Sequence, residues 1–583
     1  MDRQYPIFTE KAACQDCYKC VRNCPVKAIK VENDHALIVH ESCVFCGTCV
    51  LSCPVGAKKV RDDVPKVKRL LQIRKKVIVS LAPSFVPEFA PATPDQVAAS
   101  LRALGFWAVS ETAIGADLLN AHIAETLSLP DAKGIYISSA CPAAVDLVRK
   151  YHPNLAQRIV GAYSPAFAHA SYLKKLYGPD VGVVFIGPCI AKKGEADAHE
   201  KLVDAALGFK ELQAWFEEMG ILPERMQVPE APSGDAAFVP RRAGRGSIYP
   251  VEGGMISSLR RHRIEGAVSF MSFTGLPAIS RAIADLESAP VNEPVFLELL
   301  ACEGGCINGP EMSSGRGTVA KRLEVMDYAR LSEAEPFADH ELPIAEGIEA
   351  EPISESPISE ADLRFALTTV GKYSREDELN CSGCGYDSCR DFARAMLRGR
   401  AEKTMCVSHM RKLAQKKTNA LIRSMPSGVV IVDRSLTIVE CNRQFAELAG
   451  ADTLVAWEAK PGLEGASLSK VMPALEEIFE AVNVNGLEID RDLKLGKKVV
   501  NISAFAVEQG AFAGAVVQDI TLPSVRKQRI VSQASKVIDK NLAVVQKIAY
   551  LLGENAAETE SILNSIIGSF TSGEDDESKK KES

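Results

Sequence analysis

The stretches CQDCYKCVRNCP (14–25) and CVFCGTCVLSCP (43–54) repeat one pattern, four cysteines followed by proline. Each run is spaced C-x2-C-x2-C-x3-C-P, which is typical of chains that bind iron–sulfur clusters through soft thiolate ligands. A pair of zinc knuckles is the alternative that cysteines alone leave open. Because such clusters carry electrons, we expect the rest of the chain to use them.

The doubled pattern resembles two-cluster ferredoxins, in which the fourth cysteine of each run binds the other cluster. This resemblance implies that residues 1–63 form a ferredoxin-type module with two [4Fe-4S] clusters. The implied ligands are Cys14, Cys17, Cys20 and Cys53 for one cluster, and Cys43, Cys46, Cys49 and Cys24 for the other.

Composition narrows the class of protein. The 583 residues carry a net charge of −7 and are 46% hydrophobic, which is normal for globular proteins and gives no reason to expect nucleic acid as a partner. We recognise no signal peptide and no apolar run of about 18 residues, so we expect a cytoplasmic protein that does not enter a membrane. Seventeen cysteines in such a chain indicate metal ligation rather than disulfides.

Between residues 64 and 345, short β-branched runs alternate with helical patterns, which predicts an α/β domain with mainly parallel strands. Three strand-like runs lead directly into cysteines, in SSACP (138–142), IGPC (186–189) and LLACEGGC (299–306). Loops after parallel strands are where α/β folds bind ligands. Cysteines so far apart in the sequence suit a large buried cofactor. A single iron–sulfur cluster and buried structural cysteines are the alternatives.

The central segment is similar, over roughly residues 75–330, to the catalytic domain of [FeFe]-hydrogenases. The signatures of that family read T-S-C-C-P, P-C-x-A-K-K-x-E and M-A-C-x-G-G-C, and this chain has SSACP, PCIAKKGE and LACEGGC. The resemblance implies an H-cluster, which is a [4Fe-4S] cubane joined to a diiron unit that carries CO, cyanide and a dithiolate amine. It implies Cys141, Cys189 and Cys302 as cubane ligands, and Cys306 as a ligand that also bridges to the diiron unit.

Further site residues are implied by the same resemblance. Lys192 matches the lysine that binds one cyanide, and Pro83 and Ser84 match residues around the other. Ala140 stands where efficient hydrogenases have a cysteine that relays protons, and a methyl group cannot exchange a proton. His122 could carry protons instead, although a structural histidine is the alternative. The resemblance thus implies an intact cofactor site with an impaired proton path.

The second half starts with an acidic, Pro/Ser-rich stretch, 346–365, which predicts a linker. Residues 366–416 resemble a four-cysteine Fe-S domain, with a zinc site as the alternative. We expect this domain to hold a [4Fe-4S] cluster between the hydrogenase domain and the C-terminal part of the chain, with a helix over 390–404. Its candidate ligands are Cys381, Cys384, Cys389 and Cys406.

Residues 417–522 resemble a PAS domain, on the pattern SGVVIVDRSLTIVECNRQFAEL (427–448). Beyond it, 523–570 are predicted to form a signalling and dimerisation helix with Asn541 in the apolar seam, where an asparagine sets the register of paired helices. A helix packed on its own PAS domain is the alternative. The charged segment 571–583 is predicted to be disordered.

The predicted fold class is a multidomain α/β chain with a ferredoxin-like 2[4Fe-4S] module, an α/β H-cluster domain, a small helical Fe-S domain, an α+β PAS domain and a C-terminal helix. This order resembles the PAS-containing sensory [FeFe]-hydrogenases. It implies a homodimeric, slow hydrogenase (H2 ⇌ 2H⁺ + 2e⁻) that senses H2. The implied partners are H2, a ferredoxin or other redox protein, and a downstream kinase or phosphatase. A metabolic ferredoxin-linked hydrogenase and a non-catalytic Fe-S redox switch without the diiron site are the alternatives.

Overall fold

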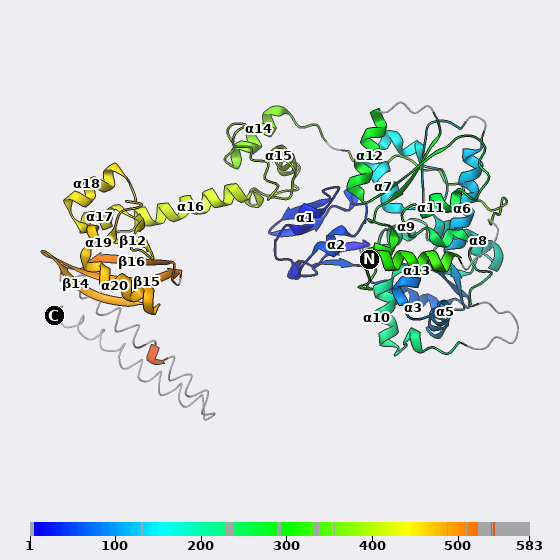
Figure 1. Ribbon diagram of the computed structural model, residues 1–583, viewed down its shortest axis with the longest axis horizontal. Helices are drawn as coiled ribbons and strands as arrows, with labels where there is room; N and C mark the ends of the chain where they lie inside the picture. The colour runs from blue at the N-terminus through cyan, green and yellow to red at the C-terminus, as the bar shows by residue number, and fades with distance from the viewer. Residues whose placement is uncertain are drawn as a thin grey trace, which may run out of the picture. The chain divides into compact units, whose positions relative to one another are not determined.

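The computed structural model forms two compact units, Met1–Met410 and Arg411–Ser583, which we describe separately (Figure 1). The described residues are 5–522, without 130–131, 229–236, 289–292, 331–336, 355, 487 and 509, together with 538 and 540–542. Apart from these last four positions, the predicted helix 523–570 and tail 571–583 lie outside the described residues. Among the helices that are described, we find none long and apolar enough to cross a bilayer.

The N-terminal module pairs its short strands twice. Strand β1 (Ile7–Thr9) lies antiparallel to β4 (Lys58–Val60), and β2 (Ile29–Glu32) lies antiparallel to β3 (His35–Ile38). Each cysteine run then bends into a five-residue helix, α1 (Lys19–Asn23) or α2 (Thr48–Ser52). The fourth cysteine ends the helix, because the proline after it cannot continue one. The first cysteines of a run and its fourth therefore lie at different ends of a helix.

Two parallel sheets form the central domain, as the alternating pattern predicted. The first has the order β6-β5-β8-β9 and the second the order β10-β11-β7. Strands β5, β8 and β11 are buried at every position, as expected for parallel strands covered on both faces. The strands are β5 (Val77–Leu81), β6 (Ala108–Glu111), β7 (Ile135–Ile137), β8 (Gly182–Gly187), β9 (Ala205–Gly208), β10 (Ser269–Thr274) and β11 (Val295–Leu300).

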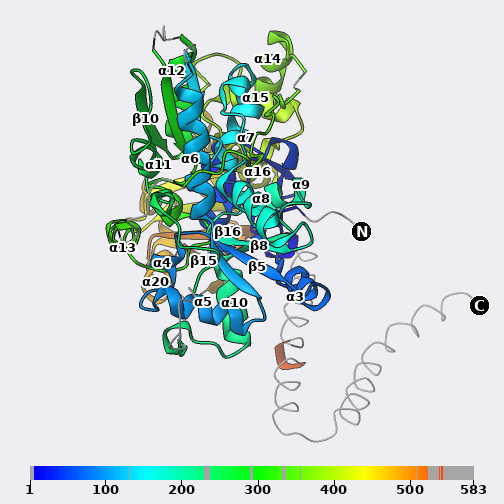
Figure 2. The same cartoon turned by 90° about the vertical axis from the view of Figure 1, so that its right-hand side faces the viewer.

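Helices cover these sheets, and α6 (Ala113–Leu127) is buried along most of its length. It packs directly on α8 (Pro165–Tyr177) at Gly115, where a β-carbon would lie 1.9 Å from the Pro165 carbonyl oxygen. Figure 2 shows α6 beside α8, and α8 also contacts β5 and β8. The other helices are α3 (Val64–Ile73), α4 (Phe85–Phe89), α5 (Pro94–Ala103), α7 (Pro142–Tyr151), α9 (Ala191–Ala198), α10 (Phe209–Glu218), α11 (Gly254–Leu259), α12 (Leu276–Ser288) and α13 (Thr318–Arg330).

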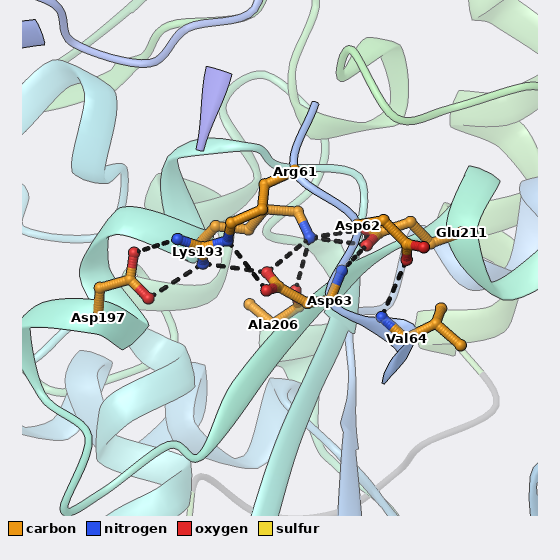
Figure 3. A network of polar contacts seen from close by, with 9 residues as sticks. Arg61, Asp62, Asp63, Val64, Lys193, Asp197, Ala206 and Glu211 are labelled. Atoms are coloured by element: carbon orange, nitrogen blue, oxygen red, sulfur yellow. Dashed lines mark hydrogen bonds and ion pairs between the residues drawn. The ribbon is translucent and has the colours of Figure 1, made fainter. Parts of the chain in front are cut away.

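A buried ionic network joins the N-terminal module to the central domain (Figure 3). Lys193 of α9, with 1% of its side chain exposed, pairs with Asp63 at 3.0 Å and with Glu211 of α10 at 2.7 Å. Arg61 pairs with Asp197 at 2.7 Å. Because every charge has a partner of opposite sign, the two parts can bury these groups at their junction.

The four-cysteine segment differs from its prediction in an additional helix, in the length of its other helix and in its packing. It contains α14 (Glu360–Thr369), and α15 (Cys389–Leu397) is shorter than the helix expected over 390–404, because Gly399 takes a left-handed φ of 66° that ends it. The segment packs on the N-terminal module rather than only between the central domain and the second unit. The Val31 amide donates to the Arg400 carbonyl at 3.0 Å.

Part of the predicted linker is held against the central domain. The Glu346 amide donates to the Gly161 carbonyl at 3.0 Å, and the Glu351 amide to the Arg149 carbonyl at 3.0 Å. The His199 ring pairs with the Glu346 carboxylate at 3.1 Å. Residues 346–351 thus run along the domain surface as an ordered strap.

The second unit is a five-stranded antiparallel sheet in the order β13-β12-β16-β15-β14. Asn442 organises its start, because its side-chain oxygen accepts from the amides of Val429 and Phe445 at 2.9 and 3.0 Å. This is the strand–turn–strand–helix pattern predicted from the sequence. The elements are α16 (Val407–Ser424), β12 (Gly428–Asp433), β13 (Ile438–Cys441), α17 (Arg443–Ala449), α18 (Ala451–Ala459), α19 (Leu468–Val471), α20 (Glu476–Asn485), β14 (Ile489–Leu495), β15 (Lys498–Glu508) and β16 (Phe512–Asp519).

We predict that Lys193→Met lowers the free energy of unfolding by about 3–5 kcal/mol, because it leaves Asp63 and Glu211 buried without their cation. The matched control is Lys68→Met, which removes the exposed Lys68–Glu218 pair and should cost at most about 1 kcal/mol. Anaerobic chemical denaturation measures both. Equal losses for the two variants would contradict a structural role for the buried network.

Candidate iron–sulfur and hydrogen-activating site

The four central cysteines come from three loops that meet at one place. Cys141 is the N-cap of α7, and Cys189 follows β8. Cys302 follows β11, and Cys306 opens a short 3₁₀ helix (Cys306–Asn308). The Cys302 thiol lies within electrostatic reach of the other three. The fold thus gathers the four predicted ligands from the ends of strands in both sheets.

The environment of these thiols suits metal ligation. Burial raises the pKa of Cys141, raises that of Cys189 to about 12, and places that of Cys302 well above the ordinary value; neighbouring thiols add to the shift for Cys189 and Cys302. A buried thiolate is therefore costly unless a positive charge compensates it. Iron supplies that charge, because metals bind the deprotonated sulfur.

Two glycines allow the loop with the last two cysteines to pass close to its surroundings. Gly304 and Gly305 have φ values of 72° and 102°, which other residues rarely adopt. A β-carbon on Gly305 would lie 2.2 Å from the Pro250 carbonyl oxygen. The backbone path between Cys302 and Cys306 thus depends on two residues without side chains.

A cavity of about 100 Å³ lies beside the cysteines, with a mainly apolar lining. Pro83, Ser84, Ala140 and Lys192, which the sequence analysis placed around the cofactor, all line this cavity. The Ser84 hydroxyl is buried and has no hydrogen-bond partner among the described protein groups. An unpartnered donor in an apolar cavity fits a polar ligand such as cyanide.

Lys192 is held by two groups at the cavity wall. Its ammonium donates to the Ser164 hydroxyl and to the Glu195 carboxylate, both at 2.6 Å. Its side chain is only 8% exposed. The two adjacent lysines of the motif therefore differ in role, since Lys192 faces the cavity and Lys193 binds the N-terminal module. Glu195 belongs to the quoted motif, but sequence reasoning gave it no role.

Ala140 lines the cavity where a relay thiol was expected to be missing, and Glu298 is the ionisable group that sequence reasoning overlooked. Glu298 of β11 is 1% exposed. Its Oε1 accepts from the Met255 amide at 3.1 Å, while Oε2 has no partner among the described protein groups. Burial raises its pKa to about 7. The cue was a lone glutamate in an apolar strand, directly before the Cys302 motif.

His122 is not among the described residues that line the cavity. The α6 residues that do line it are Ala113 and Ala116. Asn120, farther along α6, accepts from the hydroxyl of the cavity residue Tyr249 at 2.7 Å and donates to Ser258 at 2.7 Å. The observed contacts give no support to the suggestion that His122 carries protons.

The eight N-terminal cysteines fall into two groups that match the implied pairing. Cys20 is within electrostatic reach of Cys14, Cys17 and Cys53. Cys49 is within reach of Cys43, Cys46 and Cys24. The fourth cysteine of each run accepts the amide of the residue four positions later, at 3.3 Å for Cys24 and 3.2 Å for Cys53.

One of these groups adjoins the central site. Cys46 lines a small cavity together with all four central cysteines, and its thiol lies within electrostatic reach of Cys302. Gly47, next to it, packs so closely on Pro310 that a β-carbon would lie 2.6 Å away. The group of Cys24, Cys43, Cys46 and Cys49 is thus the neighbour of the central site.

The third cysteine set also comes together, since Cys384 lies within electrostatic reach of Cys381 and Cys406. Cys389 and Cys406 are buried, whereas Cys381 is exposed. Within the described part of the chain, no three His, Cys, Asp or Glu side chains are close enough together to hold a single metal ion.

Comparison with known families assigns these segments. The family model "Iron only hydrogenase large subunit, C-terminal domain" matches residues 75–310. This segment is an iron-only hydrogenase domain. A 4Fe-4S dicluster model matches residues 13–58, an Fe-S cluster model 377–408 and a PAS model 416–485. The protein is [FeFe]-hydrogenase-like, with iron–sulfur domains and a PAS domain.

Curated relatives are hydrogenases of low identity. Iron hydrogenase 1 of Clostridium pasteurianum is 25% identical over 42% of this chain, which spans only about half (51%) of that relative. The periplasmic [Fe] hydrogenase large subunit of Nitratidesulfovibrio vulgaris is 27% identical over 56% of this chain and 90% of its own length. A solved [FeFe]-hydrogenase HydA1 from Chlamydomonas reinhardtii is 20% identical, covers 50% of this chain and 100% of its own, and has a TM-score of 0.37.

We predict a pH-dependent effect of Glu298→Gln. Because the folded-state pKa of Glu298 is raised from 4.5 to about 7, its protonation stabilises the fold at low pH, and this contribution is lost as pH rises through that window. The glutamine variant should therefore gain about 2 kcal/mol relative to wild type between pH 5 and pH 8. Chemical denaturation at both pH values tests this. Glu217→Gln, at an exposed position, is the control. A difference in unfolding free energy between Glu298→Gln and wild type that is the same at pH 5 and pH 8 would contradict the raised pKa of Glu298.

Proposed function

We propose that this protein is a cytoplasmic H2 sensor that oxidises or forms H2 slowly at an H-cluster. The redox state would pass through iron–sulfur clusters and the PAS domain to a signalling partner. The observation that carries the proposal is one cavity lined by cysteine ligands, by Lys192 and by Ala140. That lining suits a hydrogenase cofactor but lacks the usual relay thiol.

The chain's own residues would hold the cofactor in defined ways. Cys141, Cys189 and Cys302 would bind the cubane, and Cys306 would bind it and bridge to the diiron unit. When bound, the diiron unit supplies the splitting of H2 into a proton and a hydride equivalent. Lys192 carries a charge-assisted donor toward an anionic ligand, and the Ser84 hydroxyl is a second donor at the cavity wall.

Proton transfer should limit the rate. The Ala140 methyl group can neither accept nor donate a proton. Glu298 does not line the cavity, but it lies within electrostatic reach of Cys306 and has a pKa of about 7, so it can exchange a proton near neutral pH. We propose it as a slower substitute for the missing relay.

Signalling would use the second unit. The PAS domain has no obvious part in H2 chemistry, and its presence argues for a sensor over a metabolic hydrogenase. We propose a kinase or phosphatase as the partner and a homodimer as the signalling form. A metabolic enzyme that exchanges electrons with ferredoxin is the second candidate, favoured only by the two N-terminal cysteine groups.

Infrared spectroscopy of the anaerobically matured full chain is the deciding experiment. We expect bands of CO and cyanide together with about 18 irons per chain, from four cubanes and one diiron unit. Cys306→Ser should abolish those bands, because a hydroxyl is a harder and less acidic ligand than a thiol. About 16 irons per chain without such bands would support a non-catalytic switch with four cubanes and no diiron unit. Iron near ten per chain would contradict the assignment of four cubanes.

We predict that Ala140→Cys raises H2 turnover. General acid–base groups contribute about 10²–10⁴-fold, and the gain should fall at or below the low end because acidic groups farther along the usual path are also missing. Gas chromatography of H2 evolution measures this. Ala166→Cys makes the same change elsewhere on the cavity wall and should not raise turnover. No gain for Ala140→Cys would mean that proton transfer at this step does not limit the rate.

A further inference from the structure

The four-cysteine module lacks a large core of its own and shares one with the ferredoxin-type module. The same cluster of buried side chains contains cysteines of both modules. Its members from the four-cysteine module include Val370, Tyr386, Phe392, Ala395, Met405 and Cys406. Its members from the ferredoxin-type module include Cys20, Val21, Cys24, Ile29, Val31 and Cys49. Residues of both cysteine sets therefore belong to one continuous cluster of packed side chains.

The closest approach is made by Gly385, one residue after Cys384. Its φ of +95° favours glycine, and a β-carbon there would lie 2.9 Å from Val21 and 3.1 Å from the Arg22 amide nitrogen. Lys27 closes the contact by donating to the Gly385 carbonyl at 2.8 Å. The loop that carries Cys384 is thus pressed against α1, which contains Cys20 and ends at Cys24.

Tyr386 lies at the centre of this contact. It is 5% exposed, and its hydroxyl has no hydrogen-bond partner among the described protein groups. Its phenol is within electrostatic reach of both Cys384 and Cys24. A buried phenol usually finds a partner, so a donor left free between two cysteine sets fits acceptor atoms supplied by a bound cluster.

We propose that the cluster of the four-cysteine module exchanges electrons with the ferredoxin-type cluster held by Cys24, Cys43, Cys46 and Cys49, across the Gly385–Tyr386 contact, and that the Tyr386 hydroxyl donates to a sulfur at this junction. The inference deepens the proposed function, because it names the route by which electrons from H2 reach the module before the PAS domain.

By this assignment, the ferredoxin-type cluster held by Cys24, Cys43, Cys46 and Cys49 is a branch point, because it can exchange electrons with the central site and with the four-cysteine module. On one side, Cys46 adjoins the central cysteines. On the other, Cys24 adjoins Tyr386. Oxidation of one H2 releases two protons and two electrons, and each cubane accepts one electron. The second ferredoxin-type cluster, whose ligand Cys17 is exposed, is then a side branch toward an external redox protein.

The proposed electron-transfer route can be tested without H2. Full-length protein made without the diiron unit is reduced with dithionite, and the EPR signal of the four-cysteine cluster is assigned by its loss in Cys384→Ala. We expect this signal to be broadened and fast-relaxing through magnetic coupling to a neighbouring reduced cluster. Cys46→Ala should abolish the coupling, whereas Cys17→Ala should leave it. Coupling that survives Cys46→Ala, or that disappears only in Cys17→Ala, would overturn the assignment.

The hydroxyl is tested by a variant that keeps the ring. A donated hydrogen bond stabilises the more negative, reduced form of the cluster that accepts it. Tyr386→Phe should therefore lower the reduction potential of the cluster whose sulfur accepts this bond. The shift should correspond to a roughly two- to tenfold change in the reduced-to-oxidised ratio. Tyr373→Phe, at a side chain that is 81% exposed, is the matched control. An unchanged potential in Tyr386→Phe would refute the role of the hydroxyl.

H2 provides the final arm of the test. In matured protein, H2 should reduce the four-cysteine cluster in Cys17→Ala but not in Cys46→Ala. Failure of H2 to reduce any cluster in wild type would refute the proposed function, yet it would leave the dithionite result standing. Reduction by H2 in Cys46→Ala would refute the branch point alone.

Discussion

A thiolate buried away from water is stable only beside a positive charge, and the arrangement of the first unit depends on this constraint. Burial and neighbouring sulfurs raise the pKa of the central thiols Cys189 and Cys302. Burial has the same effect on Cys24 and Cys43. Iron compensates the charge in each case, so folding and cluster assembly should be coupled.

Helix α7 connects two of these sites mechanically. Cys141 caps its N-terminus. At its other end, Lys150 donates to the Cys43 carbonyl at 2.9 Å and the Tyr151 hydroxyl to the Ser42 carbonyl at 2.6 Å. The strap at Glu351 binds the same end of the helix. Cys141 and the loop that carries Ser42 and Cys43 are therefore held by the same helix.

The two adjacent lysines of the central motif have different roles, one at the cavity and one at the contact with the N-terminal module. Consecutive residues on a helix point about 100° apart, so Lys192 reaches the cavity while Lys193 reaches Asp63 and Glu211. One motif thus positions a cofactor donor and fixes the N-terminal module at once. This explains how Cys46 comes to adjoin the central cysteines.

The sequence by itself determined the domain types, the parallel α/β layering, the cysteine sets and the substitution at Ala140, because these depend on local spacing and periodicity. Tertiary structure decided which residues from distant parts of the chain contact and bury one another. The burial of Glu298, which raises its pKa, depends on segments far from it in the sequence. The pairing of Lys193 with Asp63 and the packing of Tyr386 near Cys24 likewise join residues whose sequence separation carries no periodic signal. Only a folded chain excludes water from such groups, and that exclusion gives them their chemistry.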